Sequence, residues 1–84
     1  YNKAVHNGVN IKFSLSEPGD VDIFIYNILG QKIKEYKLED RRKGDDIVQW
    51  DGKNSRGEYI SSGVYLVQLK HKSDVITKKM VFMK

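Results

Sequence analysis

The chain has 84 residues, of which 15 are basic and 11 acidic, and its formal net charge is +4. This length provides one small domain rather than two. The sequence contains no cysteine, which excludes thiolate catalysis, cysteine-bound zinc and disulfides. It also lacks a run of about 18 apolar residues, so no membrane-spanning helix is predicted. Because the sequence begins with Tyr1 rather than methionine, we expect a module of a larger protein.

The first half of the chain shows the two-residue periodicity of β-strands. Apolar and polar residues alternate over 9–15, as in a strand with one face on a core. A proline followed by a glycine within 16–20 indicates a turn. Residues 20–27, DVDIFIYN, are apolar on both faces, which predicts a central or covered strand. The segment 27–32 is predicted to be a hairpin connection in which Gly30 takes a positive φ.

The second half continues the pattern. Residues 31–38 predict a polar edge strand, with a β-bulge that brings Ile33 and Tyr36 into phase. The remaining predicted elements are a charged loop at 39–46, a strand at 46–50, a long loop at 51–63, a strand at 64–71, a tight turn at 72–74 and a last strand at 75–83. These six or seven short strands, spaced by roughly 8–12 residues, favour an all-β fold of about seven strands. We interpret residues 1–84 as a single antiparallel β-sandwich domain.

The stretch WDGKNSRGEYISSGVYLVQL, residues 50–69, gathers acids, glycines and aromatics and could be a ligand loop. A calcium loop is disfavoured, because Lys53 and Arg56 occupy positions that should carry oxygen ligands or glycine. We instead expect turns in which side-chain oxygens accept backbone hydrogen bonds and glycines take a positive φ. The residues assigned structural roles are Gly30, Trp50, Asp51, Gly52, Asn54, Gly57, Gly63 and Tyr65.

No other group of residues predicts catalysis, a metal or a cofactor. His6 and His71 stand alone in the sequence and are expected to be surface residues. None of the serines lies in a nucleophile-elbow pattern. We therefore predict that the chain is not an enzyme, with no catalytic residue, no metal ligand and no cofactor.

Two kinds of binding remain to be weighed. A sugar-binding module would use a row of exposed aromatic residues, for which the candidates are Phe24, Tyr26, Tyr36, Tyr59 and Tyr65. The competing interpretation places Trp50 and Tyr65 in the core. A nucleic-acid site would use the lysines near the end of the chain, which are Lys70, Lys72, Lys78, Lys79 and Lys84. Lysines that protect a sheet edge explain this cluster equally well, and we predict no nucleic-acid partner.

Three stretches together resemble a known family: VDIFIYNILGQKIKEYKL, QWDGKNSRGEYISSGVYLVQL and the terminal TKKMVFMK. Over residues 9–84 the chain resembles the C-terminal sorting domain of bacterial type IX secretion cargo. It is also similar to the related immunoglobulin-like domain of the flagellar hook capping protein. The sorting family usually opens with a proline-asparagine-proline box, whereas residues 1–10 contain no proline.

The resemblance implies an immunoglobulin-like sandwich that directs an exported protein through the type IX system. Its partner would be the secretion machinery at the outer membrane, and its place the cell surface or medium of a Gram-negative bacterium. Lys78, Lys79 and Lys84 would then contact that machinery. Two alternatives stay open: a polysaccharide-binding or spacer module beside a glycoside hydrolase, and a scaffold domain of the flagellar hook cap.

Overall fold

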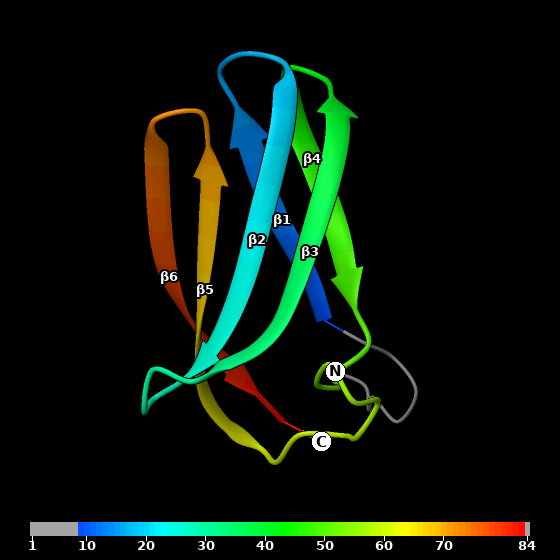
Figure 1. Ribbon diagram of the computed structural model, residues 1–84, viewed down its shortest axis with the longest axis vertical. Coiled ribbons are helices and arrows are strands. Elements are labelled where there is room, and N and C mark those ends of the chain that lie inside the picture. Colours follow the sequence, from blue (N-terminus) through cyan, green and yellow to red (C-terminus); the bar gives the residue numbers. More distant parts are fainter. Residues whose placement is uncertain (1–8, 84) are drawn as a thin grey trace.

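The structure is a computed structural model that describes residues 9–83. It is built from antiparallel strands, and the predicted all-β fold is confirmed (Figure 1). The described residues form six strands: β1 (Val9–Leu15), β2 (Gly19–Asn27), β3 (Lys32–Arg41), β4 (Gly44–Trp50), β5 (Gly63–His71) and β6 (Asp74–Phe82). The expected number was about seven. The segment 51–63 is the expected long loop, with side-chain-capped turns and one isolated bridge, Lys53 to Tyr59.

The strands form two layers. One sheet has the order β3-β2-β5-β6, and the other contains only β1 and β4. Figure 1 shows β1 and β4 crossing behind β2 and β3, while β5 and β6 extend past them on the left. The small sheet therefore covers only part of the large one.

The core lies between the layers and follows from the alternation of side chains. Val21, Ile23 and Ile25 of β2 are almost fully buried, and the inward side chains of β5 pack beside them. Trp50 at the end of β4 is fully buried. Burying a large apolar side chain stabilises a fold by roughly 1.5–3 kcal/mol, so these few residues hold the two sheets together.

Strand β2 is central, as its apolar faces predicted, but within residues 9–83 no layer covers its outer face. There the rings of Phe24 and Tyr26 stack with centroids 6.3 Å apart. The ammonium groups of Lys32 and Lys70 lie 5.5 and 5.2 Å from the Phe24 centroid. Neighbouring side chains of the same sheet thus shield the second apolar face.

Strand β3 is an edge strand with the predicted bulge. Ile25 pairs with Lys34 and Tyr26 with Lys32, which leaves Ile33 as the extra residue. The phase change allows both Ile33 and Tyr36 to pack against the core.

The expected charged loop at 39–46 is wrong. Strand β3 continues to Arg41 and β4 begins at Gly44, so only two residues connect the sheets. Asp46 pairs with Phe13 of β1 in the ladder, and its carboxylate lies 3.6 Å from Arg41 Nε. A charged side chain is compatible with a strand where it forms an ion pair, as Asp46 does with Arg41, and the composition of the segment did not reveal this.

The expectation that His71 is a surface residue is also wrong. It ends β5 in phase with Val67 and Leu69, and it is only 3% exposed. Its Nδ1 lies 3.1 Å from the carbonyl oxygen of Asp20, which can only accept, so Nδ1 donates. Among the described residues, Nε2 has no hydrogen-bond partner. His71 therefore packs at the end of the sandwich next to the β1–β2 turn.

Candidate functional site

The loop between β4 and β5 is closed by its own side chains. Asp51 Oδ1 accepts the backbone N–H of Lys53 at 3.0 Å. Asn54 Oδ1 accepts the N–H groups of Arg56 and Glu58 at 2.9 and 3.0 Å, and its Nδ2 donates to Glu58 Oε1 at 3.0 Å. These polar groups stabilise consecutive turns, because each satisfies a donor that the loop would otherwise leave unpaired.

Glycine conformation supports the same loop. Gly52 and Gly57 have φ values of 77° and 84°. The backbone of Gly52 also lies against a ring, and a methyl group at this position would lie 2.9 Å from Phe82 Cζ. Gly30 has φ 84° in the β2–β3 turn, whereas Gly63 has no positive φ and begins β5.

Three aromatic rings join this loop to the last strand. Trp50 lies 5.6 Å from Phe82 and 6.3 Å from Tyr65 between ring centroids, and Tyr65 lies 6.4 Å from Phe82. The Trp50 indole donates to the carbonyl of Lys53 at 2.9 Å. The Tyr65 hydroxyl donates to the carbonyl of Ser61 at 2.8 Å, an arrangement similar to the tyrosine corner of immunoglobulin-like domains. Residues 50–69 thus have a structural role, because they pack against Phe82 and hold the end of β6 in place.

The lysines of the last strand do not form one patch. Lys78 pairs with Val67 and lies on the core side of β6, whereas Lys79 pairs with Leu66 and lies on the outer face. Lys84 lies outside the described residues. Lys70 covers the ring of Phe24, and Lys72 forms an ion pair with Glu17 at 3.2 Å. Consecutive strand residues point to opposite faces, so adjacency in the sequence does not create a common cationic surface.

The five aromatic candidates do not form a row either. Tyr65 is in the core and Tyr36 packs against it, while Phe24 and Tyr26 stack on the outer face of β2. Tyr59 is exposed in the 51–63 loop, with the Lys53 ammonium 4.9 Å from its ring. Sugar stacking needs several exposed rings on one surface, and this geometry separates them.

The outer face of the large sheet carries an apolar patch that sequence reasoning missed. Tyr26 pairs with Leu66, and Val64 pairs with Val81, all on this face. Val64 and Val81 are exposed, and Tyr26 and Leu66 are half-buried. We call these four residues the outer apolar patch. The alternation of residues in β5 and β6 indicated which side chains share a face of each strand. The pairing register was needed to show that these side chains are neighbours.

Titratable groups are shifted at the β3 edge. Hydrogen bonds from Lys32 and Lys37 lower the pKa of Glu35, and the bond to Glu35 raises the pKa of Lys37. Burial, assisted by the negative charge of Asp51, raises the pKa of Tyr36. Within residues 9–83, no cluster of three His, Asp or Glu residues could hold a metal ion. The same residues form no helix long and apolar enough to cross a bilayer.

The fold and the tyrosine-anchored loop define an immunoglobulin-like β-sandwich module. The family model of the FlgD Ig-like domain matches residues 2–74, and the chain belongs to this family.

Solved structures agree on the fold. One of them is FlgD from Xanthomonas campestris, whose structure was described in relation to the hook capping that is essential for flagellar assembly. Its TM-score with this chain is 0.69, and the sequence identity is 17%. The match covers 90% of this chain and 56% of that one. FlgD from P. aeruginosa has a TM-score of 0.67 and 20% identity, covering 86% of this chain and 58% of that one. This chain thus spans little more than half of these relatives. No curated protein matches the sequence.

These findings correct the predicted function. The matching family is that of the hook-capping protein, so assignment to type IX sorting is wrong, although the similarity to the hook-cap domain is confirmed. The predicted partners, which were the outer-membrane secretion machinery and polysaccharide, are wrong for the same reason. The predicted secreted or cell-surface location is wrong as well. The physical reason is that the motifs quoted for the resemblance build turns and core contacts. Such motifs report the fold and cannot discriminate between two families that share it.

Proposed function

We propose that residues 1–84 form one non-catalytic scaffold domain of a larger flagellar hook-capping protein. The observation that carries the proposal is the family match over residues 2–74. The likeness of the fold to two FlgD structures supports it. That this chain spans 56–58% of those chains supports the further proposal that it is a part of a longer protein.

The geometry supports a scaffold role in two ways. The loop, the aromatic rings and β6 form one packed unit, which gives the domain a rigid surface. The outer apolar patch then offers a place for a neighbouring protein, because exposed apolar surface is stabilised by association. The work of this domain would be to hold subunits in position at the hook rather than to transform a substrate.

The proposal is tested by an in-frame deletion of residues 1–84 from the parent gene, in the organism that encodes it. Electron microscopy should show cells without hooks, and swimming should be lost. A plasmid copy of the full-length parent gene should restore both, which controls for effects on neighbouring genes. Normal hooks and normal swimming in the deletion strain would rule out the hook-capping role.

A further inference from the structure

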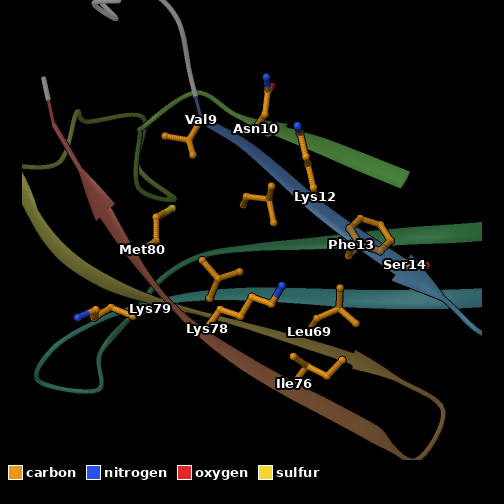
Figure 2. Close-up of a pocket in the computed structure, with 12 residues that line it drawn as sticks. Val9, Asn10, Lys12, Phe13, Ser14, Leu69, Ile76, Lys78, Lys79 and Met80 are labelled. Carbon is orange, nitrogen blue, oxygen red and sulfur yellow. The ribbon is translucent and has the colours of Figure 1, made fainter. Parts of the chain in front are cut away.

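A groove runs between β1 of the small sheet and β6 of the large one (Figure 2). Its volume is about 220 Å³. The apolar residues that line it are Val9, Ile11, Phe13, Val67, Leu69, Ile76 and Met80. Ile76 is 49% exposed although it faces the sandwich interior. The small sheet does not extend over β6, and the groove is what remains uncovered.

Both sides of the groove are strand edges. Among residues 9–83, β1 pairs only with β4, and β6 pairs only with β5. The outer edge of each strand therefore presents backbone N–H and C=O groups that no described strand pairs. Immunoglobulin-like sandwiches of the constant type contain seven strands, and six are described here. The groove could therefore receive one more strand, because added strands bind such edges through backbone hydrogen bonds.

The charge of the groove indicates the occupant. Among the residues that the structure describes, three lysines line it, Lys12, Lys78 and Lys79, and no acidic residue does. Figure 2 shows Lys78 extending into the space between β6 and β1, while Lys79 points away from it. Asp45 and Asp46 border a neighbouring hollow, and Asp46 already faces Arg41. The groove itself is apolar and cationic.

This charge argues against two occupants from the chain itself. Antiparallel pairing of β6 with β6 of a second copy, in the register centred on Lys78 and Lys79, would place lysines opposite lysines, which is unfavourable. Residues 1–8 include Lys3 and no acidic residue. A segment that complements the groove brings negative charge, which neither of these two occupants supplies.

We propose that the groove accepts an extended segment of a partner protein, in which apolar and acidic residues alternate, as a seventh strand added to β6. The apolar side chains enter the groove beside Ile76 and Met80. The acidic ones lie on the outer face next to Lys79, where opposite charges on neighbouring strands attract. The aliphatic stem of Lys78 covers the inserted apolar side chains. This inference rests on the proposed function only for the expectation that the domain has protein partners.

Peptide binding to the 84-residue chain tests the proposal. The probes are acetyl-Val-Glu-Val-Glu-Val-Glu-Val-amide, the same peptide with lysine for glutamate, and the acidic peptide N-methylated on every residue. Amide chemical shifts should move in Ile76–Met80 and Ile11–Phe13 with the acidic peptide. The methylated peptide should not bind, because it cannot donate the ladder hydrogen bonds.

Charge reversal makes the test specific. Lys79→Glu should weaken binding of the acidic peptide about tenfold and strengthen that of the lysine peptide. Lys37→Glu, on the opposite edge strand β3, should change neither affinity more than about twofold. No binding, equal binding of both charged peptides, binding of the methylated peptide, or shifts confined to β3 would overturn the proposal. None of these outcomes depends on whether the parent protein builds hooks.

Discussion

At the scale of single residues, Gly52 combines a backbone and a packing requirement. Its φ is 77°, and a methyl group would contact the Phe82 ring at 2.9 Å. We predict that Gly52→Ala lowers the free energy of unfolding by about 2–4 kcal/mol, since left-handed strain and overpacking add. Urea denaturation measures this.

Gly57 provides the matched control. It has φ 84°, but apart from its two chain neighbours no atom of residues 9–83 lies within 4 Å of the position that a methyl group would take. Gly57→Ala should therefore cost only the backbone term, about 1–2 kcal/mol. Equal losses for the two variants would show that Phe82 does not pack on Gly52.

Tyr36 is expected to make the free energy of unfolding depend on pH in the alkaline range. Its pKa is raised above the ordinary value of 10.0, first by burial and second by the charge of Asp51. Folding therefore favours the protonated phenol. This stabilisation is fully present below about pH 10 and is lost as the pH rises through the raised pKa. Between pH 9 and 11 the wild type should lose more unfolding free energy than Tyr36→Phe. Parallel losses in urea denaturation would contradict the assignment.

At the scale of elements, Phe82 fixes the end of β6. It is 8% exposed and contacts Trp50, Tyr65 and Gly52. We predict that Phe82→Ala costs about 3–5 kcal/mol, a large part of the roughly 4–13 kcal/mol expected for a domain of this size. The adjacent Val81 is 60% exposed, and Val81→Ala should cost about 0.5 kcal/mol or less. Thermal or urea unfolding that ranks the two variants equally would refute this role.

The strands themselves were largely predictable, because alternation is a local property. The segments 9–15 and 20–27 match β1 and β2 within one residue, and even the bulge at Ile33 followed from a change of phase. The end of β3 and the start of β4 were missed because the charged residues there resemble those of a loop. His71 was missed because its burial depends on Gly19 and Asp20, which lie far away in the sequence.

Surfaces were less predictable than strands. The outer apolar patch and the β1–β6 groove depend on which strands are neighbours, and strand order cannot be read from periodicity. Lys78 and Lys79 illustrate the point, because the register separates two residues that the sequence places together. Function was predicted wrongly for a related reason, since the quoted motifs describe the packing that two families share.

At the scale of the whole molecule, the outer apolar patch is expected to contact another protein. Val81→Lys should leave the unfolding free energy within about 0.5 kcal/mol of wild type, because the side chain is largely exposed. A plasmid copy of the parent gene that carries Val81→Lys should nevertheless fail to restore hooks in the deletion strain. Thr77→Lys is the control, because Thr77 lies on the same strand and face outside the patch. Full restoration of hooks by Val81→Lys would exclude the patch from assembly.

We propose above that this immunoglobulin-like domain acts at the flagellar hook. Immunogold electron microscopy of growing cells, with an antibody against residues 1–84, tests it most directly. We expect gold particles at the ends of growing hooks and none on cells that carry the deletion. Labelling spread over the cell surface, with hook ends unlabelled, would contradict it.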